Sequence, residues 1–437
     1  MLVLVLGLCA TMVCISCGST KPKDPPSGLP DRVLASQGVT STFDFGALRI
    51  LNGYNDSIPR VQPIGAGNNP GLMAVTPTRN FAAAFDSSTN TVYLVNTYTE
   101  SDAGNIRLPG PITSMVFPSA VGIGYAAVPT ATVQGFDFIG ALDVMNFNNG
   151  TVLTIPVNNA ETVVANSNGS QLLVFSNDSN SVTVLSPSAA VPPVDQSCST
   201  APNAVCTVIP GFDRPVNAVI SGNTAYILNC GAECGGIQAS VQTLDLTSLT
   251  VGAPVPVNGA TIAVLSGSQL YVAGNGTPTG PLCTSIPSAA PTAATYCGTL
   301  DIVNVSTMTD PYFNNPASEI AITDGYHDRI DLTVGGQVFV GSYNCTNVGD
   351  SSDPVGEVRG CLAIYNSNTN AVVIPPDNGN VTGLQGFISR TVEYVAEDGN
   401  LRVYETDTDT LLIDDYLPQG TINVTGYVWD VKAIDFF

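Results

Sequence analysis

The stretch VNAVISGNTAYILNCGAECGGIQASVQTLDL, residues 216–246, carries the pattern that decides the fold. Two apolar runs, 216–220 and 224–229, flank the small turn SGN, and a third run, 240–246, follows a loop with two cysteines. Short runs rich in Val, Ile and Tyr between small turns indicate β-strands. Gly and Asn supply the positive φ that tight hairpins need. The stretch therefore predicts consecutive antiparallel strands.

The same arrangement recurs along the chain. First strands are expected near residues 72, 114, 162, 216, 261, 329 and 381, and each unit has about four strands. Repeats of this length with four strands are the signature of propeller blades. An array of sandwiches could give similar runs, but it would not need one turn pattern seven times. The sequence thus predicts an all-β fold, a β-propeller of four-stranded blades.

Two pieces lie outside the seven units. Residues 47–64 are expected to form third and fourth strands, and residues 426–437 a first strand with room for a second. A ring must close, because open sheet edges invite aggregation. Joining the N- and C-terminal strands in one composite blade would close it. Counting gives eight blades, or seven if the ends only extend existing sheets.

The N-terminus, MLVLVLGLCATMVCISCGST, has an apolar run through Ile15 that is short for a membrane span and ends in small residues. The segment 15–18, Ile-Ser-Cys-Gly, resembles the lipobox of bacterial lipoproteins. The resemblance implies a signal peptide over 1–16 and lipidation of Cys17, the first mature residue. An ordinary secretory signal is the alternative. Pro and charge in 21–32 predict a tether over 17–42, followed by a single propeller domain over 43–437.

A second resemblance concerns the repeat itself. The segment NPGLMAVTPTRN, residues 69–80, resembles the start of the YVTN-type β-propeller repeat through Pro70, Gly71, Ala74, Val75 and Pro77. The tetrad that gives the repeat its name is best matched by residues 226–229, YILN, and Arg79–Asn80 replaces the usual Asp-Gly turn. The resemblance implies a propeller scaffold that is often exported, and it implies no particular activity.

Eleven cysteines occur, of which Cys9 and Cys14 fall in the expected signal peptide. With Cys17 lipidated, the other eight fall into local pairs: Cys198 and Cys206, Cys230 and Cys234, Cys283 and Cys297, Cys345 and Cys361. The last three pairs are expected between second and third strands, where antiparallel neighbours come within disulfide range. Metal and redox sites favour Cys-x-x-Cys spacing, which is missing here. We therefore predict disulfides and an oxidising compartment.

The net charge, the single histidine and the arrangement of carboxylates exclude several classes of binding partner and metal site. The chain has 13 Lys and Arg against 35 Asp and Glu, a net charge of −22, which argues against nucleic acid and against binding anionic lipid by charge alone. The only histidine, His327, is expected in a loop, bonded to Asp324 or Asp328. One histidine cannot build a multi-histidine metal site. The carboxylates of 405–410 lack the Gly and distal Glu of an EF-hand and are expected in a solvated turn.

The sequence therefore predicts no catalytic, cofactor-binding or metal-binding residue. We expect a monomeric, non-enzymatic propeller lipoprotein of the bacterial cell envelope, in the outer membrane or periplasm or at the cell surface. Its partner would be a protein, peptide or glycan, and its only membrane contact the lipid anchor. The alternative is a metal-dependent hydrolase or lactonase with a carboxylate-bound divalent ion in the central channel. Three or more Asp, Glu or Asn converging from first strands would favour that alternative. A purely structural envelope component is the third possibility.

Overall fold

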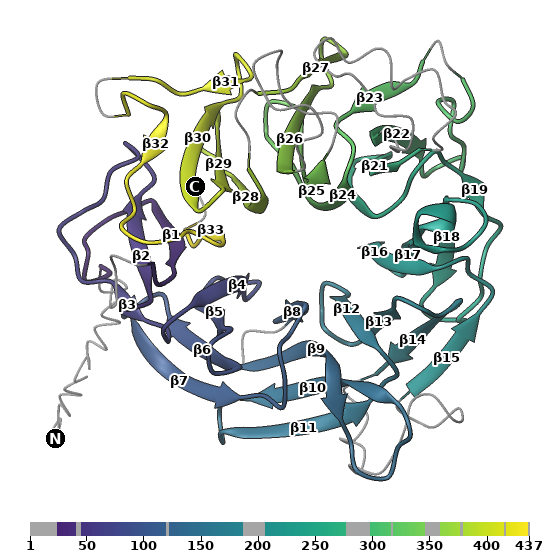
Figure 1. The fold of residues 1–437 in the computed structure, drawn as a ribbon, viewed down its shortest axis with the longest axis horizontal. Coiled ribbons are helices and arrows are strands. Elements are labelled where there is room, and N and C mark those ends of the chain that lie inside the picture. Colours follow the sequence, from purple (N-terminus) through teal and green to yellow (C-terminus); the bar gives the residue numbers. More distant parts are fainter. Residues whose placement is uncertain are drawn as a thin grey trace, which may run out of the picture.

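Eight sheets surround a central axis and form one ring (Figure 1). The computed structural model describes residues 24–40, 45–118, 122–186, 206–276, 298–315, 318–345, 359–375, 379–414 and 417–435. The one helical element among them is a 3-10 turn, η1 (Gly231–Cys234). The predicted propeller is confirmed, and its blade number is eight.

Blade 1 is built from both ends of the chain. From the axis outward its strands are β33 (Val431–Ala433), β1 (Arg32–Gln37), β2 (Ala47–Asn52) and β3 (Ile64–Gly65). The predicted closure by terminal strands is confirmed, and residues 47–64 supply the third and fourth strands as expected.

The predicted start of the propeller at residue 43 is wrong, because β1 lies inside the segment 17–42 that we expected to be a tether. Every residue of β1 is buried, and the strand pairs with β2 on one side and β33 on the other. The propeller therefore begins by Arg32.

The other seven blades are consecutive along the chain, and each runs from its innermost to its outermost strand in sequence order. Blades 2 to 4 are β4 (Pro70–Val75), β5 (Phe81–Asp86), β6 (Thr91–Asn96), β7 (Ser101–Arg107); β8 (Ser114–Val116), β9 (Ile123–Thr132), β10 (Ile139–Asn146), β11 (Thr151–Pro156); and β12 (Ala160–Ala165), β13 (Leu172–Ser176), β14 (Ser181–Leu185), β15 (Cys206–Pro210). Blades 5 and 6 are β16 (Pro215–Ser221), β17 (Thr224–Asn229), β18 (Ser240–Asp245), β19 (Val255–Pro256); and β20 (Ile262–Ser266), β21 (Gln269–Asn275), β22 (Gly298–Asn304), β23 (Ile320–Ile322). Blades 7 and 8 are β24 (Tyr326–Leu332), β25 (Gln337–Cys345), β26 (Arg359–Asn366), β27 (Ala371–Val373); and β28 (Val381–Gly386), β29 (Val392–Glu397), β30 (Asn400–Glu405), β31 (Thr410–Leu411), with β32 (Thr421–Ile422) added beside β30.

The turn residues adopt the backbone that the sequence predicts. Gly169, Gly222, Gly267 and Gly336, in the turns between first and second strands, all have positive φ. The two-residue hairpin Asp398–Gly399 joins β29 to β30 with φ of 47° and 77°, which is the twist-matched type of turn.

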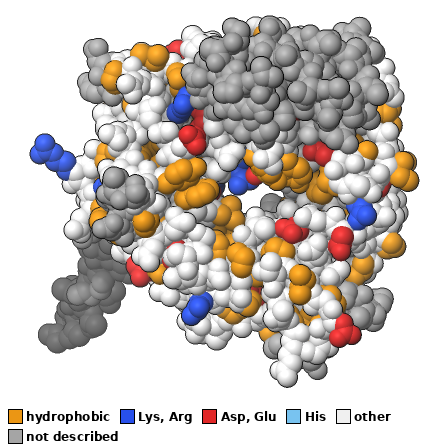
Figure 2. All heavy atoms as spheres, in the orientation of Figure 1, with side chains coloured by type: hydrophobic (Ala, Val, Ile, Leu, Met, Phe, Trp, Pro, Cys, Tyr) orange, Lys and Arg blue, Asp and Glu red, His pale blue; other side chains and the backbone are white. Residues whose placement is uncertain are grey.

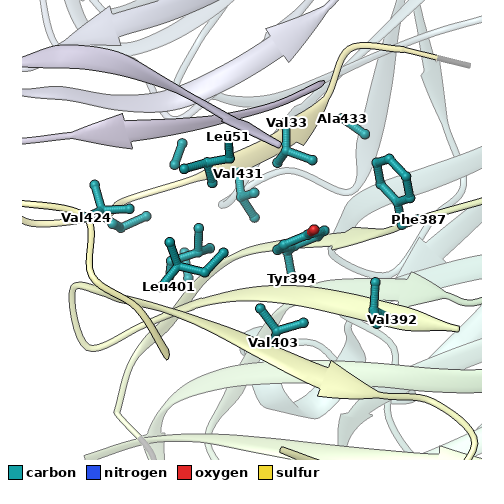
Figure 3. Packing of buried hydrophobic residues seen from close by; sticks show 14 of the residues in the cluster. Val33, Leu51, Phe387, Val392, Tyr394, Leu401, Val403, Val424, Val431 and Ala433 are labelled. Atoms are coloured by element: carbon teal, nitrogen blue, oxygen red, sulfur yellow. The ribbon is translucent and has the colours of Figure 1, made fainter. Parts of the chain in front are cut away.

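The core consists of apolar layers between neighbouring blades. One such layer fills the junction of blades 8 and 1, where Val33 and Val431 pack against Tyr394 and Phe387 (Figure 3). Strands that bury both faces in this way carry near-continuous apolar runs, which is why the strands read as VFV, YVA or LLVF rather than as alternating patterns.

Strand direction gives the ring two distinct faces. We call the end at which first strands begin the cavity face; segments joining second to third strands also lie there. The opposite end, which carries the turns after first and third strands, is the tether face, because residues 24–31 lead into β1 from it. Ser27 is fixed on the tether face through its backbone N and Oγ, which donate to the Glu100 carboxylate between β6 and β7.

Two buried polar clusters on the tether face hold blade 1 to its neighbours. Arg32 lies between Glu100 of blade 2 and Asp435, with N–O distances of 2.9 and 2.8 Å. On the other side Arg390 of blade 8 binds both carboxylate oxygens of Asp56 at 2.7 Å, and the Tyr394 hydroxyl donates to the same carboxylate. The ring is thus closed by charge-assisted hydrogen bonds as well as by strand pairing.

Two predicted disulfides are present. Cys230 is joined to Cys234 across η1 with a Cα–Cα distance of 5.6 Å, and Cys345 to Cys361 between β25 and β26 at 6.2 Å. Both lie between second and third strands, as expected, although the first is closed by a helical turn and not by paired strands. Cys206 is also disulfide-bonded. The calls on Cys17, Cys198, Cys283 and Cys297 fall outside the described residues.

The disulfides indicate an oxidising, extracytoplasmic compartment, because reducing compartments keep most thiols free. Within the described ranges, no helix has the length and hydropathy to cross a membrane.

Candidate functional site

A cavity of about 670 Å³ opens at the centre of the cavity face. First strands of blades 2 to 7, or the residues just before them, form most of its wall, and three residues come from the ends of second strands or the loops after them. The lining residues are Leu72, Thr113, Ser114, Met115, Glu161, Thr162, Asn177, Val216, Asn217, Cys234, Thr261, Ile262, Tyr326, His327, Asp328, Arg329 and Tyr343. In Figure 2 acidic and basic side chains lie near the central hollow among polar and apolar atoms.

Blade 7 supplies the most varied part of this wall. Tyr326 and Tyr343 are register partners on β24 and β25, and their rings lie 5.3 Å apart. Asp328 accepts a hydrogen bond of 2.9 Å from Arg329, whose Nε also donates to the carbonyl oxygen of Thr382 in blade 8. Blade 7 thus presents two aromatic rings, a carboxylate and a guanidinium to the same cavity.

Glu233 of blade 5 lies beside the cavity, and both its backbone and its carboxylate are fixed in position. It belongs to η1, which the Cys230–Cys234 disulfide closes, and Cys234 itself lines the cavity. Its carboxylate accepts a hydrogen bond of 3.0 Å from the backbone N of Asn275 in blade 6. The Asn275 side chain then donates to the carbonyl oxygen of Gly325, next to Tyr326. These contacts tie three blades together at the rim.

The carboxylic acids of this region are weaker acids than usual, because burial disfavours their charged forms. Burial raises the pKa of Glu233 to about 7, against two hydrogen bonds from Asn275. Burial also raises the pKa of Glu161 and of Asp328, with Arg329 opposing the shift of Asp328. The pKa of Tyr326 is raised first by burial and then by the charges of Tyr343, Glu233, Asp328 and Glu161. The three carboxylates therefore act electrostatically on one aromatic ring.

The structure corrects the prediction for His327. It lies in β24, not in a loop, and is fully buried. Its Nε2 is 2.8 Å from the carbonyl oxygen of Thr323, and burial lowers its pKa to about 4. Neither Asp324 nor Asp328 is its partner in that contact. The predicted loop position is therefore wrong, because the packing of blade 7 against blade 6 buries this residue.

First strands do supply polar groups to the cavity, namely Glu161, Asn217 and Asp328. However, no three His, Cys, Asp or Glu side chains in the described part of the chain lie close enough together to hold a metal ion. The carboxylates surround a cavity without forming an ion-binding cluster. No spacing in the sequence marks these residues, since each comes from a different blade; their shared position near the starts of first strands is the one signal that could have found them.

This geometry defines an eight-bladed propeller with a polar, aromatic cavity at one end of its channel. Comparison with solved structures agrees on the fold: dihydro-heme d1 dehydrogenase NirN in complex with DHE has a TM-score of 0.61 at 11% sequence identity, over 94% of this chain and 77% of that one. Hydrazine synthase from Kuenenia stuttgartiensis has a TM-score of 0.45 at 13% identity, over 84% and 86% of the two chains. No protein-family model and no curated protein sequence matches this chain. At 11% identity the likeness to NirN shows the propeller fold alone.

Proposed function

We propose that this chain is an exported, non-catalytic binding protein that captures a positively charged side chain of a protein or peptide partner in the cavity. The observation that supports it is that Glu161 and Asp328 line the cavity together with Tyr326 and Tyr343, while Glu233, beside the cavity, also acts electrostatically on Tyr326. Carboxylates attract an ammonium or guanidinium group, and aromatic faces add cation–π attraction. A ring of rigid blades holds these groups in place before binding, which lowers the entropy lost on association.

The location belongs to the same proposal. Lipidation of Cys17 after removal of residues 1–16 would anchor the protein in a bacterial envelope, and the two disulfides agree with an oxidising compartment. We also propose that the blades derive from YVTN-type repeats, on the motif at 69–80. NirN is described in complex with DHE. In this chain the one histidine, His327, is fully buried and its Nε2 contacts the carbonyl oxygen of Thr323.

A peptide titration tests the binding function. The probe is a fluorescein-labelled Gly-Ser peptide with one central arginine, and the matched peptide has glutamine in its place. We expect the arginine peptide to bind, and Glu161→Gln with Asp328→Asn to weaken binding by about tenfold or more, since a hydrogen bond to a charged group contributes about 1.5–3 kcal/mol. The control is Asp137→Asn, an exposed carboxylate on the same face that does not line the cavity.

The binding should also depend on pH. Because the pKa of Glu233 is about 7, its carboxylate is mostly protonated at pH 6 and mostly charged at pH 8. Affinity for the arginine peptide should therefore rise across this interval, and Glu233→Gln should remove the rise. Equal binding of both peptides, or a pH profile unchanged by Glu233→Gln, would contradict the proposal. Displacement of the peptide by Mn²⁺ or Ca²⁺ would instead favour the metal-dependent hydrolase.

A further inference from the structure

Large apolar side chains are exposed on the tether face of four consecutive blades. Val334 of blade 7 is 74% exposed, Ile388 of blade 8 is 57%, Tyr54 of blade 1 is 72% and Tyr98 of blade 2 is 40%. Each lies in a turn that follows a first or third strand. Together they form an arc, the apolar arc, centred on the blades that the two chain ends build.

The rest of the tether face is different. Turns of blades 3 to 6 at this end that lie in the described ranges expose Ser, Thr, Asn and Gly, as in 148–150, 167–168, 222–223 and 306–307. Larger apolar residues of these turns, such as Phe147, Leu249 and Met308, pack against core clusters instead. On the cavity face, the exposed large apolar residues are Val39 and Phe45 of blade 1, Ile139 of blade 3, Ile237 of blade 5 and Tyr343 of blade 7, which lines the cavity; Ile413 follows the outer strand β31 of blade 8.

The chain leaves the ring within this arc. Ser27 is fixed on Glu100, beside Tyr98, and Arg32 starts β1 at the same end. Ser27 is ten positions from Cys17 in the sequence. Fully extended, that segment reaches about 35 Å. A lipid on Cys17 would therefore hold Ser27, on the tether face, within that distance of the bilayer.

We propose that the apolar arc docks on the surface of a phospholipid bilayer, so that the propeller stands on its tether face with the cavity turned outward. The inference rests on the proposed lipid anchor. Tyrosine suits the interface, where its ring is apolar and its hydroxyl remains wet. The lipids are expected to be uncharged overall, because the chain's net charge of −22 disfavours an anionic surface. Lasting attachment by acyl chains needs a second contact when few chains are present, and the arc supplies one.

Tryptophan fluorescence on vesicles with brominated phosphatidylcholine tests the docking. In a Trp429→Phe background, Ile388→Trp places a reporter in the arc, and Ile237→Trp, on the other face, is the matched control. We expect Ile388→Trp to lose most of its emission and shift to the blue on vesicles, with Ile237→Trp unchanged. Adding Val334→Ser, Tyr54→Ser and Tyr98→Ser should restore much of the lost emission.

The docking of the apolar arc and the lipid anchor on Cys17 can be tested independently. Intact mass of the membrane-extracted protein shows whether Cys17 is acylated, which tests the anchor by itself. If it is not, a chain from residue 18 with an N-terminal hexahistidine tag, held on vesicles with nickel-chelating and brominated lipids, runs the same comparison. Equal quenching of both reporters, or no quenching of either, would mean that the propeller tumbles on its tether, and the proposal fails. A blue shift of Ile388→Trp that grows with protein concentration without lipid would assign the arc to a second copy and also overturn it.

Discussion

Replacing Arg32 with alanine is expected to lower the free energy of unfolding by about 3–5 kcal/mol, the usual effect of removing one partner from a buried ion pair. Arg32 is 5% exposed, and its guanidinium donates to Glu100, to Asp435 and to the carbonyl oxygen of Thr97. Without it two carboxylates would stay unpaired at the seam where the chain ends meet. Urea unfolding of the purified protein, followed by circular dichroism, measures the change.

Two control variants show whether the loss of stability comes from the ion pairs of Arg32 or from the removal of any positive charge. Arg107→Ala removes an exposed arginine on β7 of the neighbouring blade and should change stability by less than about 0.5 kcal/mol. Arg32→Lys keeps the charge but loses the planar fork that reaches several acceptors, so its effect should be intermediate. If Arg32→Ala and Arg107→Ala unfold at the same urea concentration, the seam is not held in the way described.

Removing the Cys345–Cys361 disulfide is also expected to lower the free energy of unfolding substantially. The bond closes a segment with a sequence separation of 16, and both cysteines are fully buried. The chain-entropy model gives about 3 kcal/mol for a loop of this length. The double variant Cys345→Ala with Cys361→Ala should lose about that much stability in the same urea assay, while its affinity for the arginine peptide stays close to that of the parent protein.

The other disulfide provides the contrast. Cys230 and Cys234 are separated by 4 residues, so the same model gives about 2 kcal/mol. This bond fixes η1 and hence Glu233, so Cys230→Ala with Cys234→Ala should weaken peptide binding as well as stability. If removal of the 345–361 bond weakened binding more than removal of the 230–234 bond, the role given to Glu233 would be wrong.

The repeating strands could be predicted because their signals are local. First strands expected near 72, 162, 216 and 329 begin at Pro70, Ala160, Pro215 and Tyr326. A turn such as SGN, with Gly222 at φ 58°, fixes the start and end of its hairpin without help from the rest of the chain. The third and fourth strands of blade 1 could be predicted for the same reason, because their signals are also local.

Features that depend on distant parts of the chain could not be predicted in this way. The segment RVLASQ of β1 follows a Pro-rich stretch and pairs with residues almost 400 positions away, so no local turn marks it. Glu161, Glu233 and Asp328 come from three blades and share no spacing. His327 seemed to lie in a loop because polar residues surround it, and only the packing of blades 6 and 7 buries it.

Both ends of the chain close one ring of eight blades. Ala35 of β1 pairs with Val431 of β33. Antiparallel partners have Cα atoms about 4.5–5.5 Å apart, within the range of about 4.4–6.8 Å for a disulfide. Peptide mass spectrometry of Ala35→Cys with Val431→Cys, after mild oxidation of the folded protein, should find nearly all of it joined by a bond between these two positions. If both new cysteines remain free in the folded protein, the chain ends do not share a sheet and the ring is not closed as described.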